Sequence, residues 1–225
     1  MKAPLSLEEP GPPIDTLRAL GRQAFDHLKL EAMPGGGTIA VVGRPFEIEG
    51  VGSGLVEALE ERGYRAWVGC HWLEGVRPPP GQAPSAYGVL QDYRDEAVEE
   101  VTMAILVQTS LFNPAIAMTA LLWCLDNVPT KRFGLVSLLA DQGAIDELRE
   151  SVSFATAAPL DVSIGYSIDE SERPRDEGYR SLHHLISDED SQRDDRRFMP
   201  GIVAARREQR RHNRADLSNG PRRGT

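Results

Sequence analysis

The chain of 225 residues is long enough for one full-sized hydrophobic core, and no break in composition separates a second domain. Its 40% hydrophobic and 26% charged residues are ordinary for a soluble globular protein. The formal net charge of -9 argues against a general affinity for nucleic acid or for acidic membrane surfaces.

The first third of the chain predicts a flexible arm, a leading helix and two strand-and-loop units. The apolar residues of the leading helix recur with helical spacing, Asp15 caps it and Pro34 ends it. In order, we expect an arm over 1–13, a helix over 14–32, a strand over 38–42, a loop over 43–54, a helix over 55–62 and a strand over 64–69. A proline-rich loop containing Pro78 and Pro84 follows, and we expect it to close as a flap.

The middle of the chain predicts further strands that alternate with helices. We expect strands over 101–107, 133–139 and 162–166, and helices over 115–127 and 143–150. The first two strands are continuously apolar, as central parallel strands covered on both faces are. This alternation indicates an α/β fold with a doubly wound, mainly parallel sheet, which binds ligands at the carboxyl ends of its strands.

The remaining segments set the domain limits at 14–203. The stretch 170–197 is dense in charge and has little periodicity, so we interpret it as a solvated insertion or mobile loop. The Arg-rich tail over 204–225 favours a solvated terminal helix that frays, with a nucleic-acid-binding arm as the alternative.

The cysteines and the N-terminus bear on location. Cys70 and Cys124 are the only cysteines and stand beside apolar residues, so two buried reduced thiols are expected, with a disulfide as the alternative. The N-terminus lacks the apolar core of a secretion signal. The longest apolar run, around 115–125, is too short to cross a bilayer. We therefore expect a cytoplasmic protein with no membrane partner.

Four strings follow one another in a particular order. They are Gly69-Cys-His-Trp-Leu-Glu-Gly75, the stretch 104–115, Ser167-Ile-Asp-Glu170 and Phe198-Met-Pro-Gly201. In order and spacing they resemble segments of the uracil phosphoribosyltransferases, over nearly the whole chain. The resemblance implies a sheet of the type I phosphoribosyltransferase kind and a homodimer or larger oligomer.

The chain departs from this family where the family binds phosphoribosyl pyrophosphate. Gln108 stands in place of the acidic residue that opens the family's ribose-phosphate loop. Asn113 and Pro114 stand where threonine and glycine cradle the phosphate, and proline has no N–H to donate. Trp72 aligns with the family's pyrophosphate-binding arginine.

The uracil-binding segment of the family is also altered. Pro200 and Gly201 are kept, but Ala204 lies near the position of the family's aspartate. Together with the altered loop, this change predicts that the chain does not carry out ordinary uracil phosphoribosyl transfer.

Polar residues nevertheless follow several predicted strands. His71, which ends a strand and has an ordinary pKa near neutrality, is a candidate for proton transfer together with Glu47 and Glu49. Each has a structural alternative: a packed histidine, or glutamates of a solvated turn. Glycines 50, 52 and 54 either form a loose phosphate loop or let the next helix approach closely. The ligand-binding candidates are Arg44, Trp72, Gln108, Thr109, Ser110, Asn113, Asp141, Pro200 and Gly201.

Three functions remain open at this stage. The first is a repurposed phosphoribosyltransferase-like enzyme acting on a small polar or nucleoside-like molecule. The second is a non-catalytic ligand-binding or regulatory relative, and the third is a phosphoribosyltransferase with an altered phosphate loop. No cofactor is expected. No metal is expected either, since His183 and His184 have no third ligand at metal-binding spacing.

Overall fold

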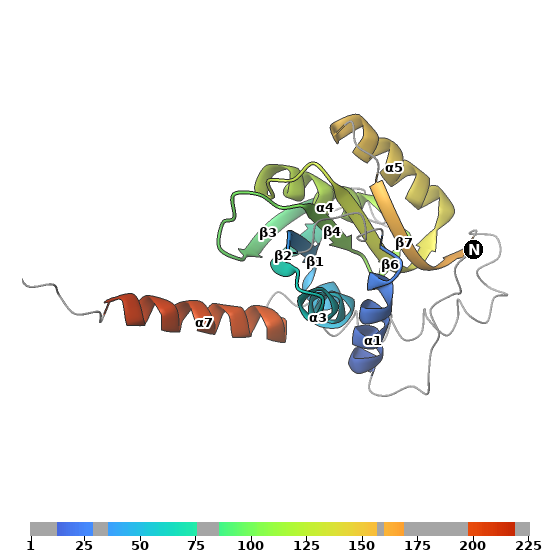
Figure 1. The fold of residues 1–225 in the computed structure, drawn as a ribbon. Coiled ribbons are helices and arrows are strands. Elements are labelled where there is room, and N and C mark those ends of the chain that lie inside the picture. The colour runs from blue at the N-terminus through green and yellow to red at the C-terminus, as the bar shows by residue number, and fades with distance from the viewer. Residues whose placement is uncertain (1–12, 29–35, 76–85, 157–159, 169–197, 219–225) are drawn as a thin grey trace, which may run out of the picture.

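A seven-stranded sheet forms the centre of the computed structural model, which describes residues 13–28, 36–75, 86–156, 160–168 and 198–218 (Figure 1). The strands are β1 (Thr38–Gly43), β2 (Arg65–Gly75), β3 (Tyr87–Arg94), β4 (Met103–Val107), β5 (Ser110–Leu111), β6 (Phe133–Asp141) and β7 (Leu160–Ile168). β2 and β3 pair antiparallel, and every other pairing is parallel. The order is β3-β2-β1-β4-β6, with β7 beyond β6 and the short β5 continuing the β4 edge of β6.

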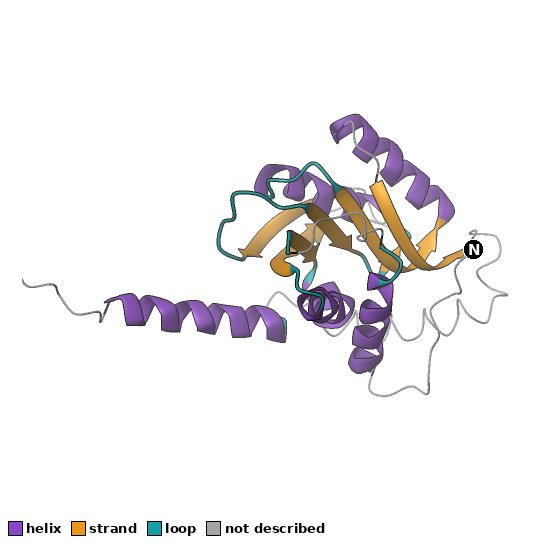
Figure 2. Ribbon diagram, viewed as in Figure 1, coloured by secondary structure: helices purple, strands orange, loops and turns teal. Residues whose placement is uncertain are grey.

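Helices cover both faces of this sheet (Figure 2). They are α1 (Pro13–Phe25), α2 (Pro45–Glu47), the π-helix η2 (Ile48–Gly52), α3 (Ser53–Glu61), α4 (Pro114–Asn127), α5 (Gln142–Thr156) and α7 (Gly201–Ser218). One core joins α1, η2 and α3 to the sheet, and a second core joins α4 and α5 to the opposite face. The predicted α/β class with a doubly wound, mainly parallel sheet is confirmed.

Most predicted strands and helices lie where the sequence places them. β1, β4, β6, β7 and α4 match their predicted runs to within a few residues. α5 and β2 begin as predicted but run further, to Thr156 and Gly75, where the predicted ends were 150 and 69. The leading helix is shorter than predicted and ends at Phe25. Apart from Pro13, the N-terminal arm lies outside the described residues, as do the proline-rich flap and the charged insertion.

The predicted loop over 43–54 is wrong, because the chain is helical from Pro45 onward. Its glycines allow close packing with α1. A Cβ atom on Gly54 would lie 1.9 Å from the carbonyl oxygen of Arg18, and one on Gly21 would lie 2.1 Å from that of Val51. The alternative in which these glycines let helices approach closely is therefore confirmed, and this stretch is no phosphate loop.

Strand β3 was not predicted. Its sequence, YGVLQDYR, has no sustained alternation of apolar and polar residues, and four successive residues from Gly88 to Gln91 are exposed. It is an edge strand that pairs only with β2 among the described strands. An edge strand with one exposed flank carries little of the burial pattern from which a strand is predicted.

Candidate functional site

A buried ion pair lies at the carboxyl end of β1. The Arg44 Nε atom lies 2.9 Å from Oε1 of Glu47, whose side chain is completely buried. Gln108, at the end of β4, donates from Nε2 to the same oxygen over 3.4 Å. Three of the predicted site residues, from two neighbouring strand ends, are therefore brought together. The positive charge of Arg44 and the negative charge of Glu47 offset one another.

His71, which lies near the carboxyl end of β1, is neutral. It is completely buried on β2, with its ring centroid 5.8 Å from that of Trp123. Burial and the positive charge of Arg44 lower its pKa from 6.5 to about 3. The expectation that His71 titrates near neutral pH is therefore wrong. It also does not end its strand, because β2 continues to Gly75, but it lies one residue beyond Cys70, which pairs with the last residue of β1.

Nδ1 of His71 and Oγ1 of Thr109 are both buried at this edge without a hydrogen-bond partner among the described residues. Buried polar atoms of this kind are rare in folded proteins, because the loss of water is not compensated. A bound polar molecule or water would supply the missing partner.

The neutral state of His71 predicts a pH-dependent stability. Because the folded pKa lies below the unfolded value, the unfolded chain binds the proton first, and stability falls as the pH drops from 6.5 toward 3. Between pH 7 and pH 5 we expect a loss of about 2 kcal/mol that the His71→Leu variant does not show. Urea unfolding of both proteins across this range measures it. Equal pH slopes would contradict the buried neutral state.

Asn113, in the loop that leads into α4, accepts hydrogen bonds from the first N–H groups of the helix. The Asn113 side chain accepts a hydrogen bond from the N–H of Ala115 over 3.0 Å, and the preceding helical residue, Pro114, has no N–H. The N–H of Ile116 points to the carbonyl oxygen of Asn113, 3.4 Å away. Tyr87 holds the other end of the Asn113 amide, with Nδ2 3.3 Å from its hydroxyl oxygen. The donors that a helix N-terminus offers to an anion are therefore absent or occupied.

The other candidates of these loops have local partners. The carbonyl oxygen of Ser110 accepts from Gln108 Nε2 over 3.3 Å. Asp141, at the end of β6, accepts from the N–H of Ala144 over 3.2 Å and so stabilises the start of α5. Both residues lie at the carboxyl end of the sheet, as predicted.

A second group of candidates joins α7 to the domain. Glu49 pairs with Arg18 over 3.1 Å and accepts from the N–H of Gly201 over 2.6 Å. Trp72 is buried, and its Nε1 donates to the carbonyl oxygen of Phe198 over 3.1 Å, two residues before Pro200. The partners of Glu49 thus come from α1 and α7, not from the strand ends that hold Glu47.

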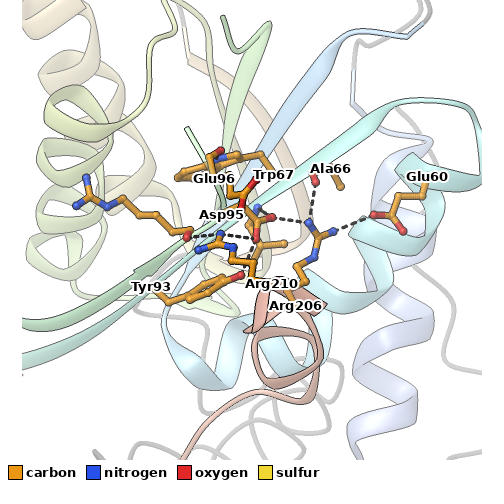
Figure 3. A network of polar contacts seen from close by, with 10 residues as sticks. Glu60, Ala66, Trp67, Tyr93, Asp95, Glu96, Arg206 and Arg210 are labelled. Carbon is orange, nitrogen blue, oxygen red and sulfur yellow. Dashed lines mark hydrogen bonds and ion pairs between the residues drawn. The ribbon is translucent and has the colours of Figure 1, made fainter. Parts of the chain in front are cut away.

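Sequence reasoning missed a polar network centred on Asp95, which lies just after β3 (Figure 3). Its carboxylate accepts from the N–H of Val68 over 2.9 Å and from the hydroxyl of Tyr93 over 2.6 Å. Arg206 and Arg210 of α7 also pair with it. Arg206 and Arg210 of the predicted tail therefore anchor α7 to the domain. Neither the free nucleic-acid arm nor the fully solvated helix describes this half of α7.

A cavity of about 410 Å³ lies beside the Asp95 network. Its walls include Glu60, Trp67, Asp95, Arg206 and Arg210. It opens at the amino-terminal end of β2, where Arg206 also bonds to the carbonyl oxygen of Ala66, and so lies far along the strand from His71. In the sequence, the only indication of this network is the i, i+4 spacing of Arg206 and Arg210, which places both on one side of a helix.

The described part of the chain has neither a membrane-spanning helix nor a metal-binding cluster. No helix in it is long and apolar enough to span a membrane. No group of three or more His, Cys, Asp or Glu side chains in it lies as a metal site requires. Cys70 and Cys124 are both free and buried, which confirms the expected reduced thiols.

Comparison with known proteins finds likeness in structure alone. No family model matches the chain, and no curated protein matches it in sequence. A hypoxanthine phosphoribosyltransferase from Staphylococcus aureus is similar at 11% identity and a TM-score of 0.42, over 68% of this chain and 71% of that one. An adenine phosphoribosyltransferase from Thermoanaerobacter pseudethanolicus is similar at 9% identity and a TM-score of 0.41, over 67% and 81%.

A hypothetical protein from Neisseria gonorrhoeae with bound ppGpp is a third similar structure. It matches at 13% identity and a TM-score of 0.41, over 76% of this chain and 90% of that one. Identities this low extend no ligand or activity to this chain. The solved structures that resemble it thus include phosphoribosyltransferases, and uracil phosphoribosyltransferases are not among these three.

Proposed function

We propose that the chain binds a small, uncharged, nucleoside-like molecule at the carboxyl ends of β1, β2 and β4, and that it does not carry out ordinary phosphoribosyl transfer. The observation that carries this proposal is the closed N-terminus of α4. The uracil phosphoribosyltransferases that the sequence resembles hold a phosphate there. In this chain the Asn113 side chain takes the Ala115 N–H, and Pro114 offers none.

The charge of the site supports an uncharged ligand. Arg44 and Glu47 neutralise each other, and Gln108 replaces a carboxylate with an amide. Thr109 and His71 each bury a polar atom that has no partner among the described residues. Such a site favours a ligand that brings hydrogen bonds and no phosphate.

Of the open alternatives, the geometry supports binding more than catalysis. His71 is neutral because its pKa is lowered to about 3, so it holds no proton to donate as an imidazolium at neutral pH. Glu47 and Glu49 are each already engaged by an arginine. A non-catalytic or regulatory relative therefore explains these residues better than a general acid–base enzyme does.

Calorimetric titration tests this proposal. We expect an uncharged nucleoside such as uridine to bind with micromolar affinity, roughly 8 kcal/mol. Uridine monophosphate, and phosphoribosyl pyrophosphate with magnesium, should bind at least about tenfold more weakly. The Thr109→Val variant, which removes the hydroxyl and keeps the shape, should weaken nucleoside binding. Micromolar binding of phosphoribosyl pyrophosphate would contradict the closed cradle, and an unaffected Thr109→Val variant would contradict the site.

A further inference from the structure

The side of α7 that faces the domain changes from apolar to polar along the helix. At its start, Val203 is buried in the core and Ile202 packs against it. Further along, four polar side chains of α7 line the cavity beside Asp95: Arg206, Gln209, Arg210 and Asn213. Their spacing of three and four residues places all of them on one side of the helix. A helix docked on a domain normally presents an apolar stripe, so this polar stripe indicates contact with polar groups or with a polar ligand.

The ion pairs of this region leave the cavity unfilled. The Asp95 side chain is only 11% exposed and pairs with Arg206 and Arg210 (Figure 3). Arg206 also pairs with Glu60 over 2.9 Å. These two acids and two arginines offset one another. A volume of about 410 Å³ nevertheless remains beside them, which lies within the range of roughly 300–1,000 Å³ typical of small-molecule pockets.

Two further charged side chains on the cavity wall form no ion pair within the described part of the chain. They are Arg65, at the start of β2, and Glu96, which follows Asp95. Both are exposed, and they do not pair with each other. The backbone oxygen of Glu96 accepts from Nε1 of Trp67 over 3.1 Å, but its carboxylate has no partner among the described residues. Opposite charges that share a cavity in this way can hold the two ends of one ligand.

We propose that this cavity binds a small zwitterion of the free amino acid type, with its carboxylate on Arg65 and its ammonium group on Glu96. A guanidinium matches a carboxylate through two parallel N–H···O bonds, and a carboxylate accepts from an ammonium group. Three acids and three arginines line the cavity, so the wall has no net charge that favours a purely anionic or cationic ligand.

The position of the cavity gives the bound molecule a structural effect. The side-chain amides of Gln209 and Asn213 offer it uncharged donors and acceptors from α7. A ligand held by these groups and by Arg65 contacts both α7 and the start of β2, so its binding stabilises the attachment of the helix. This site lies at the other end of β2 from the strand ends near His71, and the two sites are independent.

Calorimetric titration of the full chain with three matched compounds tests this site. L-Glutamine, whose side-chain amide suits Gln209 and Asn213, should bind with a Kd of about 100 μM. N-Acetyl-L-glutamine lacks the ammonium group, and L-glutamine α-amide lacks the carboxylate. Each should bind at least about tenfold more weakly than L-glutamine does.

Two variants assign the ends of the ligand. Arg65→Gln should weaken L-glutamine binding at least about tenfold and leave binding of the α-amide unchanged, since the α-amide has no carboxylate. Glu96→Gln should weaken L-glutamine binding equally and leave binding of the N-acetyl compound unchanged. Glu99→Gln is the matched control, because Glu99 is exposed but does not line the cavity, and it should bind as the wild type does.

Because Arg65 and Glu96 are exposed, both variants should melt as cooperatively as the wild type does. Bound L-glutamine should also slow amide hydrogen exchange over residues 206–213, since the ligand holds this part of α7. Neither binding nor slower exchange at about 5 mM L-glutamine would overturn the proposal. So would equal affinities for the three compounds, or an unchanged affinity in both folded variants, because the charged ends would then not be recognised here.

Discussion

Replacing Arg44 with methionine should destabilise the protein by about 3–5 kcal/mol, a large part of the stability of a domain this size. The reason is the position of Glu47, which is fully buried and receives Nε of Arg44 at 2.9 Å. Without the guanidinium, a carboxylate remains in the protein interior with Gln108 as a weaker donor at 3.4 Å. Urea unfolding monitored by circular dichroism gives the free energy of unfolding directly.

The double variant Arg44→Met/Glu47→Leu serves as the control for this prediction. Replacing both members of a buried ion pair with apolar residues is often neutral, so the double variant should recover most of the lost stability. The same variant should lose nucleoside binding if the polar group at the strand ends forms the site. If Arg44→Met alone costs less than about 1 kcal/mol, water reaches Glu47 and the pair is not a buried one.

The fold of this chain is largely predictable from its sequence. β4 is a short continuous apolar run and β6 is mostly apolar, and such runs identify the covered central strands of a parallel sheet. α4 is recognisable because Pro114 opens it and an apolar run fills it. The sequence pattern did not predict that the chain becomes helical at Pro45, because tertiary packing determines this conformation. The run from Pro45 to Glu61 is helical because its glycines fit against α1, a contact with residues some 30 positions away.

The candidate site was predictable in its location but not in its chemistry. Strand order alone brings Arg44, Glu47 and Gln108 to one edge. Whether His71 carries a proton depends on burial and on its distance from Arg44, and neither is visible in a sequence. The pairing of Asp95 with Arg206 joins residues 111 positions apart, and no local pattern indicates such a contact.

The polar residues that hold α7 are distinct from those at the strand ends. Glu49, Trp72 and Gly201 all serve to attach the start of α7, and the Asp95 network attaches its middle. α7 is thus fixed to the domain at two separate places, and its last turns extend beyond the body of the domain (Figure 1). None of the contacts that hold α7 involves Arg44, Glu47 or Gln108, so the ligand site proposed at the strand ends is separate from this attachment.

The second large effect is expected at Gly54, where an added methyl group should destabilise the protein by at least about 3 kcal/mol. A Cβ atom there would lie 1.9 Å from the backbone oxygen of Arg18, and a backbone atom cannot turn aside as a side chain can. Alanine is the better helix former by about 1 kcal/mol, so helix propensity alone predicts the opposite sign. We expect the cost of the steric clash to exceed the gain in helix propensity. To relieve the clash, α1 and α3 must separate by about 1 Å, which opens the core around Leu17 and Leu55.

Urea unfolding of Gly54→Ala, compared with Gly88→Ala, measures the effect. A Cβ atom on Gly88 would meet no atom within 4 Å, so that variant should stay within about 0.5 kcal/mol of the wild type. If Gly54→Ala is instead as stable as the wild type, α1 and α3 do not cross at the separation described. In that case the glycines of 50–54 would have no packing role, and the alternative of a ligand-binding loop would return.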